Sequence, residues 1–155
     1  MVRIQVENWE RPVCAFWVKT IDSRARGAGQ SLIVVAHSLG CLAFVHWAAK
    51  HRQKIGGALL VAVPNPNGSN FQQRAKGFAP LPLVELRCKS ILVCSEDDPY
   101  GGPEYAQFCA DAWGSTVVCI GRAGHINAAS DLGRWPAGFK LLNELRSEVA
   151  GSHGG

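Results

Sequence analysis

Short apolar runs alternate along this chain with longer stretches in which apolar residues recur every three or four positions. The short runs predict buried β-strands, and the longer stretches predict amphipathic α-helices. Their alternation favours a mostly parallel sheet with helices on both faces, which is the three-layer α/β/α class. The expected strands are 31–36, 58–63, 91–94 and 116–120, and the expected helices are 12–26, 39–50, 104–113 and 136–149.

Three segments fall outside this alternation. Residues 3–6 are a short strand candidate, and residues 151–155 are a glycine-rich end that we expect to be a flexible tail. Residues 64–82 are rich in proline, asparagine and glycine and predict a long surface loop after the second strand, of a length that is usually functional or disordered. A chain of 155 residues has room for one core. We therefore expect a single domain over residues 1–150, with 64–82 as a small lid or a plain covering loop.

The stretch Ala36-His37-Ser38-Leu39-Gly40 stands where the first of these strands gives way to a helix. A serine at this place fits a nucleophile elbow, a sharp strand-to-helix turn that lifts the hydroxyl above the edge of the sheet. The usual motif has glycine two residues before the serine, and Ala36 differs from glycine by one methyl group. A small residue, a serine and a glycine at this spacing also recur by chance, so the interpretation depends on partner residues further along the chain.

An acid and a histidine come later in the order Ser, Asp, His that is typical of α/β-hydrolases. Asp98 comes after the strand 91–94, and His125 comes after the strand 116–120. A serine hydroxyl is a weak nucleophile at neutral pH, so a histidine must take its proton and a carboxylate must orient the imidazole. We expect Ser38 to be the nucleophile, His125 the base and Asp98 the acid. Pro99 restricts the backbone of Asp98 to an extended conformation, which favours it over Asp97, a solvated neighbour in this interpretation.

Further motifs accompany these residues: His46-Trp47-Ala48, 57–62, Phe78-Ala79-Pro80-Leu81-Pro82, Asp98-Pro99-Tyr100, Trp113-Gly114, Gly124-His125-Ile126-Asn127 and Trp135-Pro136. Together they resemble the small serine hydrolases related to retinoblastoma-binding protein 9, a compact α/β-hydrolase family, over about residues 3–145. The resemblance implies that Ser38, Asp98 and His125 occupy the family's nucleophile, acid and base positions. It also implies activity as an esterase or a related acyl hydrolase.

The start of the chain departs from that family, whose members usually begin with an apolar strand and a glycine-rich loop. That strand would lie beside the nucleophile strand, so residues 3–6 must either pair with residues 33–35 or leave a gap. In the hydrolase scheme the loop gives one backbone amide to the oxyanion hole, and the residue after the nucleophile, here Leu39, gives the other. Two explanations are open, a chain clipped at its start and a shortened variant whose sheet has closed up. We favour clipping, and we expect the N-terminally truncated chain to be an impaired hydrolase.

Three residues are candidates for substrate binding. Phe78 and Leu81 would line an acyl pocket if residues 64–82 form a lid, and they would merely cover the core if that segment is a plain loop. His37, beside the nucleophile, would contact the substrate, or would pack or hydrogen-bond to secure the turn.

Composition narrows the partners. The net charge of +4 comes from scattered residues, without a run of like charges, so no nucleic-acid footprint is expected. The six cysteines have neither a C-x-x-C pair nor metal-type spacing, and we expect them to be reduced, with no metal site and no cofactor. The start carries no secretory signal pattern, and the apolar stretch 31–49 is interrupted by His37, Ser38 and Gly40, so we expect no membrane span and a cytoplasmic protein.

These observations predict a serine hydrolase of carboxylesterase type that acts on a small-molecule ester through a Ser-His-Asp triad. The same triad would also serve a thioesterase or an acyltransferase. The alternative from another class is a catalytically impaired hydrolase-fold protein that serves as an interaction module for a protein partner.

Overall fold

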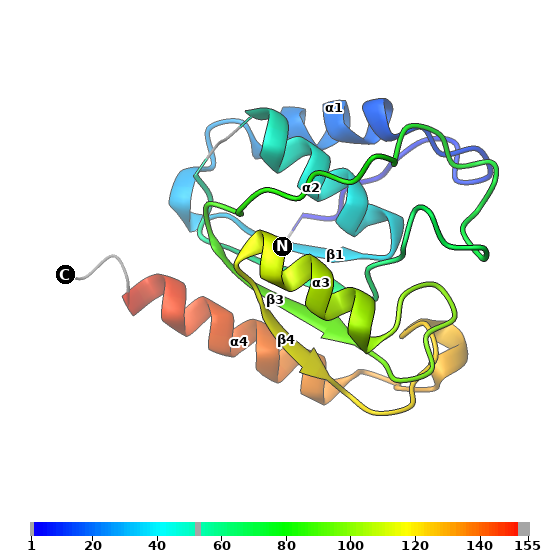
Figure 1. Cartoon of the computed structure of the whole chain (residues 1–155). Coiled ribbons are helices and arrows are strands. Elements are labelled where there is room, and N and C mark those ends of the chain that lie inside the picture. The colour runs from blue at the N-terminus through cyan, green and yellow to red at the C-terminus, as the bar shows by residue number, and fades with distance from the viewer. Residues whose placement is uncertain (1, 52–53, 152–155) are drawn as a thin grey trace.

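A parallel β-sheet forms the centre of the molecule (Figure 1). The computed structural model describes residues 2–51 and 54–151, and in this part of the chain the sheet has four strands in the order β1-β2-β3-β4. All three neighbouring pairs are parallel, with Val34 opposite Ala58 and Cys94 opposite Cys119. The strands are β1 (Ile33–His37), β2 (Gly57–Val61), β3 (Lys89–Cys94) and β4 (Thr116–Cys119).

Helices cover both faces of the sheet, as expected of a three-layer α/β/α fold. Figure 1 shows α1, α2 and α3 on one side and α4 on the other. Pro103 in the first turn of α3 and the left-handed Gly114 after its last turn mark the ends of that helix. The helices are α1 (Cys14–Ala25), α2 (Leu39–His51), α3 (Pro103–Trp113) and α4 (Pro136–Gly151), and these bounds confirm the helical predictions.

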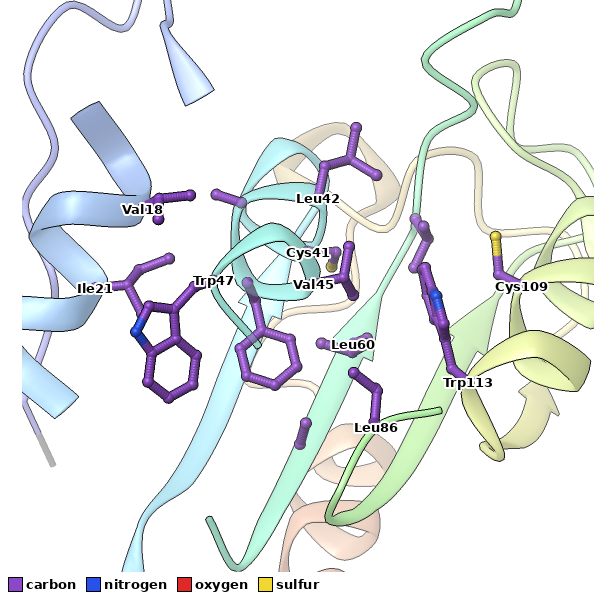
Figure 2. Close-up of a cluster of buried hydrophobic side chains, with 14 of the residues drawn as sticks. Val18, Ile21, Cys41, Leu42, Val45, Trp47, Leu60, Leu86, Cys109 and Trp113 are labelled. Atoms are coloured by element: carbon purple, nitrogen blue, oxygen red, sulfur yellow. The ribbon is translucent and has the colours of Figure 1, made fainter. Parts of the chain in front are cut away.

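The two faces of the sheet bury separate apolar clusters. The larger one lies under α1, α2 and α3 and includes Trp47, Leu60 and Trp113, each no more than 1% exposed (Figure 2). The smaller one lies under α4, where Leu145 packs against Leu59 and Val93. β2 is apolar and buried along its whole length, and β3 is buried at most of its apolar positions, which explains why continuous apolar runs predicted these two strands.

Both edges of the sheet are unpaired among the described residues, with β1 at one end of the order and β4 at the other. Among the described residues, β2 is the only strand that pairs with β1, and the side chain of Val35 on β1 is 53% exposed. The prediction of a strand over residues 3–6 is wrong: Ile4 and Val6 pack against the larger cluster, but the segment forms no strand. The apolar and polar residues alternate because one side of the segment is buried. The segment does not form the backbone hydrogen bonds with a neighbouring strand that would make it part of the sheet. The sequence left two alternatives, pairing of residues 3–6 with residues 33–35 or a gap beside that strand, and the structure has the gap.

The segment 64–82 is attached to α1. The backbone N–H of Cys14 donates to the carbonyl of Lys76, and the N–H of Lys76 donates to the carbonyl of Pro12. Phe78 is 1% exposed and packs edge-on against Trp17 and Phe71. This placement corrects the expectation that Phe78 lines an acyl pocket, because its ring is taken up by the core. Leu81 is partly buried against the same cluster.

Two further expectations concern the ends and the membrane. Gly151 closes α4, and the rest of the expected flexible tail, residues 152–155, lies outside the described residues. Within residues 2–51 and 54–151, the helices are too short or too polar to cross a bilayer.

Candidate active site

The strand-to-helix turn at Ser38 has the backbone of a nucleophile elbow. Ser38 has a φ of 54°, a left-handed conformation that is unfavourable for a residue with a side chain. Its N–H still donates to the carbonyl of Val61 on the neighbouring strand, and α2 begins at the next residue. A Cβ placed on Gly40 would lie 3.8 Å from the methyl group of Ala36, an ordinary contact distance, so these two positions approach each other across the turn.

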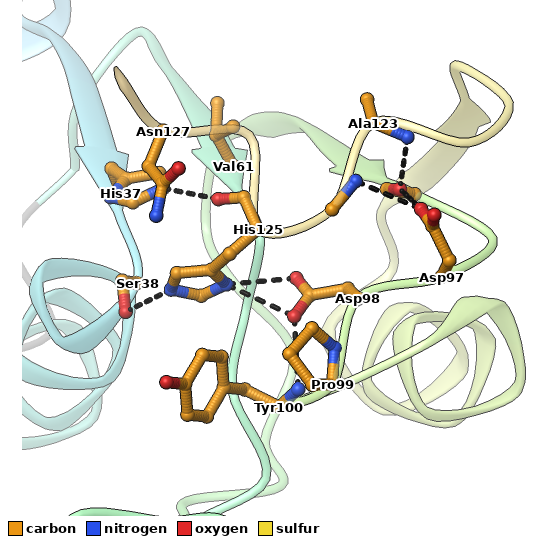
Figure 3. Close-up of polar contacts among 12 residues, drawn as sticks. His37, Ser38, Val61, Asp97, Asp98, Pro99, Tyr100, Ala123, His125 and Asn127 are labelled. Carbon is orange, nitrogen blue, oxygen red and sulfur yellow. Dashed lines mark hydrogen bonds and ion pairs between the residues drawn. The ribbon is translucent and has the colours of Figure 1, made fainter. Parts of the chain in front are cut away.

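Three side chains from distant parts of the chain meet at the carboxyl end of the sheet (Figure 3). Ser38 Oγ lies 2.8 Å from Nε2 of His125. On the other side of the ring, Nδ1 of His125 lies 3.0 Å and 2.9 Å from the two carboxylate oxygens of Asp98. The structure thus brings together the three residues that the sequence assigned to the triad.

The partners of the His125 ring determine its neutral tautomer. A carboxylate only accepts, so Nδ1 carries the proton that is donated to Asp98, and Nε2 is left to accept the hydroxyl proton of Ser38. The Asp98 side chain is fully buried and the His125 side chain is 12% exposed. A buried carboxylate beside the ring stabilises the positive charge that the imidazole gains when it takes a proton.

Asp97 also has specific partners. Its Oδ1 accepts hydrogen bonds from the N–H of Gly124 and the hydroxyl of Ser95, at 2.8 Å and 2.9 Å. Ser95 Oγ in turn accepts from the N–H of Ala123. The Gly124 N–H, the Ser95 hydroxyl and the nearby Arg122 guanidinium hold the pKa of Asp97 below its usual range. Asp97 is therefore a tie between the acid loop and the histidine loop, and its interpretation as a solvated neighbour was incomplete.

Two aromatic rings flank His125. The Tyr100 and His37 ring centroids lie 4.6 Å and 5.0 Å from that of His125. The N–H of Tyr100 donates to Asp98 Oδ1, an Asx-type contact two residues along the chain. Sequence reasoning missed Tyr100, although an Asp followed by Pro and then a residue with a free N–H is a signal for such a turn.

The other expected residues occupy different surroundings. Leu39 is the first residue of α2, so its backbone N–H belongs to the first turn, where donors lack partners within the helix. Cys41 is fully buried, and burial raises the pKa of its thiol far above the usual range, so it is a packing residue. Among the described residues, no cluster of His, Cys, Asp and Glu could hold a metal ion.

Comparisons with known proteins match most of the chain to one family. A family model described as serine hydrolase matches residues 1–144. The solved structure of a YdeN-like hydrolase from Pectobacterium atrosepticum SCRI1043 is 31% identical to this chain, covers 95% of it and 76% of its own chain, and superposes with a TM-score of 0.81. No curated protein matches the chain.

Two more distant structures show the fold alone. The ydeN gene product of Bacillus subtilis is 19% identical, with coverage of 92% of this chain and 80% of its own and a TM-score of 0.80. A thermophilic esterase from Thermogutta terrifontis is 16% identical, with coverage of 94% and 76% and a TM-score of 0.64.

Proposed function

This chain belongs to the serine hydrolase family, and from that premise we propose that it is a carboxylesterase-type hydrolase of small esters, with Ser38, His125 and Asp98 as its triad. The observation that carries the proposal is the continuous chain of hydrogen bonds from Asp98 through His125 to the Ser38 hydroxyl. Structural ion pairs between His and Asp are common, but one that ends on a serine in a strained elbow matches the needs of acyl transfer.

In the first half-reaction, Ser38 Oγ attacks the ester carbonyl carbon while its proton moves to Nε2 of His125. The carbonyl oxygen becomes an oxyanion, which accepts a hydrogen bond from the Leu39 N–H at the start of α2. The bond to the alcohol oxygen then breaks, and His125 returns the proton to that leaving group. Ser38 is left as an acyl ester.

In the second half-reaction, a water molecule attacks the acyl ester and gives its proton to His125. The carbon–Oγ bond breaks, Ser38 regains its proton and the carboxylic acid leaves. Asp98 keeps the imidazole in the tautomer that both steps require and stabilises the imidazolium that forms in each.

A fluorophosphonate probe tests the nucleophile, because its phosphorus reacts with an activated serine and loses fluoride. We expect the probe to label the protein, and Ser38→Ala to abolish both labelling and hydrolysis of p-nitrophenyl acetate. Ser31→Ala is the matched control, since Ser31 lies before β1 and its hydroxyl bonds only to the carbonyl of Ala28. Persistent labelling of the Ser38→Ala protein would show that the nucleophile is another residue.

The impaired state that we expect of this chain has a structural counterpart. Within the described residues, no strand pairs with the outer edge of β1, and a loop that follows such a strand would bring the second oxyanion amide beside Ser38. The loss of one donor costs about 100- to 1000-fold in turnover. A kcat on p-nitrophenyl acetate of about 10 s⁻¹, an ordinary value for an enzyme, would contradict this expectation.

The same unpaired edge favours a second candidate function, that of a hydrolase-fold module for protein interaction. Unpaired N–H and C=O groups on an edge strand can pair with a strand of another chain. Two results together would support this function: the probe fails to label a folded sample, and the same sample retains a stable protein partner in a pull-down experiment. Labelling of Ser38 at a rate typical of serine hydrolases would remove the case for it.

A further inference from the structure

His37 precedes the nucleophile, and its side chain is directed to the backbone of the base. Nε2 of His37 lies 2.9 Å from the carbonyl oxygen of His125, a contact between positions 88 residues apart (Figure 3). The two rings lie with centroids 5.0 Å apart. One contact thus joins the segment that carries the serine to the segment that carries the imidazole.

We propose that His37 is a positioning residue, which holds His125 by its carbonyl so that the imidazole reaches Ser38 and Asp98 at the same time. The proposal rests on the function proposed above, in which His125 is the base. Of the two roles that the sequence left open for His37, substrate contact and hydrogen bonding that secures the turn, the proposal favours a hydrogen-bonding role.

The chemistry of the contact assigns the proton on His37. A carbonyl oxygen only accepts, so His37 must donate from Nε2, and its neutral form has a bare Nδ1. Desolvation lowers the pKa of His37 and outweighs the hydrogen bond to the His125 carbonyl and the charge of Asp98, which raise it, so the neutral form is favoured at pH 7. A neutral donor at this place adds no positive charge next to the base, where a charge would oppose uptake of the Ser38 proton.

The histidine loop needs such an anchor because of its backbone. Ile126 has a φ of 48°, a conformation that is rare and strained for a β-branched residue. On the near side, the N–H of Gly124 is held by Asp97. On the far side, the carbonyl of His125 is held by His37. The loop is therefore held at the peptide group between Ala123 and Gly124 and at the peptide group that follows His125, and loss of the second anchor frees the chain next to the base.

Small displacements have large kinetic consequences at this site. A misplacement of about 1 Å in a catalytic group can lower a rate about 100-fold. We expect His37→Ala to slow fluorophosphonate labelling of Ser38 by roughly 10- to 100-fold, within that range. On p-nitrophenyl acetate we expect kcat to fall by a similar factor while KM stays constant, because the substrate does not touch the contact. His37→Gln should recover most of the rate, since its side-chain amide can donate to the same carbonyl.

His46 offers a matched control. Its Nε2 lies 3.0 Å from the carbonyl oxygen of Phe78, the same kind of contact, made from α2 to the segment 64–82 and not to the triad. We expect His46→Ala to lower the thermal midpoint and to label as fast as the parent protein. Circular dichroism of each variant establishes that it is folded. If His37→Ala does not fold, the tautomer of His37 in the parent protein still provides the test.

Nitrogen chemical shifts of the histidine side chains give a readout that does not depend on activity. In the ¹⁵N-labelled parent protein near pH 7, we expect His37 to have a protonated Nε2 and a bare Nδ1. The opposite tautomer would overturn the proposal. Equal labelling of His37→Ala and the parent would also overturn it, as would a rise in KM alone, which would return His37 to substrate binding.

The outcomes also separate the role of His37 from the function on which it rests. If the folded parent protein is not labelled, the proposed triad fails and the role of His37 fails with it. The other outcome is that the probe labels the parent, does not label Ser38→Ala, and labels His37→Ala as fast as the parent. In that case the proposed triad is supported and only the role of His37 is wrong.

Discussion

Two neighbouring carboxylates, Asp97 and Asp98, have different partners and should tolerate substitution differently. Asp98→Asn removes the charge beside the imidazole and lets an amide N–H face Nδ1, which favours the wrong tautomer of His125. We expect kcat to fall by about 10⁴-fold, the size of effect known for a triad acid. Asp97→Asn keeps an oxygen that can accept from Gly124 and Ser95, and we expect its loss to stay within about tenfold. Ester hydrolysis of the two variants checks the contrast, and similar losses would refute the division of roles.

Asp97 also predicts a dependence of stability on pH. Its pKa lies below the usual value of about 3.9, first through the Gly124 N–H, then through Ser95 and Arg122. A carboxyl with a depressed pKa in the folded state stabilises the protein above its unfolded pKa, and this contribution is lost as pH falls through the folded pKa. We expect urea unfolding to find Asp97→Asn less stable than the parent at pH 6, with the difference shrinking below pH 4.

Asp22 also has a depressed pKa, which the hydrogen bond from Arg26 lowers most. Because the parent and Asp97→Asn both contain Asp22, its contribution cancels from the difference in stability between them. A difference between the parent and Asp97→Asn that stays constant from pH 6 to pH 3 would mean that Asp97 acts without its charge.

At the scale of elements, the entry to β2 depends on a close approach of backbones at Gly56. A Cβ at this position would lie 2.3 Å from the carbonyl oxygen of Gln30 and 2.7 Å from a methyl group of Val149. A carbonyl of the main chain cannot turn aside as a side chain can, so we expect Gly56→Ala to destabilise the protein by about 1–3 kcal/mol, as overpacking does. Thermal unfolding measures this effect. Gly151→Ala, which meets no atom within 4 Å, is the control, and equal midpoints for the two would refute the argument.

The elements that could be predicted are those whose signal is local. Continuous apolar runs and helical spacing located every strand of the sheet and its helices to within a few residues, because burial on one or two faces leaves a period in the sequence. Residues 3–6 have the alternation of a strand, but whether a segment becomes a strand depends on a neighbour to pair with, and no local pattern reports that. Phe78 was misplaced for a related reason, since an apolar residue in a loop looks the same whether it faces a pocket or the core.

The same distinction holds for the site. The positions of Ser38, Asp98 and His125 follow from motifs at strand ends, which parallel topology brings to one edge. The contacts of His37 with a backbone carbonyl and of Asp97 with a backbone N–H join segments 88 and 27 residues apart. Any residue offers a carbonyl or an N–H, so the sequence carries no mark of these partners, and only the folded chain reveals them.

For the whole molecule, one edge of the sheet, that of β1, lies next to the proposed catalytic triad. Ser38 comes directly after β1, the strand whose outer edge is unpaired among the described residues. From Ile33 to His37 the strand has no Lys, Arg, Asp or Glu, although charges on edge strands are the usual protection against pairing with another chain. The site therefore lies between strands that are paired on the side of β2 and β3 and a strand edge without a partner on the side of β1.

The unpaired and uncharged edge of β1 predicts self-association that a single charge should suppress. An unpaired apolar edge favours pairing between copies, and we expect sedimentation velocity to show association that grows with protein concentration. Val35→Lys places a charge at the middle of this edge, where Val35 is 53% exposed, so it should shift the population toward monomer with little change in the thermal midpoint. Phe139→Lys is the control, because Phe139 is as exposed, at 60%, but lies on α4 away from any strand edge. If both variants suppress association equally, general surface hydrophobicity is responsible rather than β1, and a parent protein that is monomeric at every concentration would show that the edge is protected in another way.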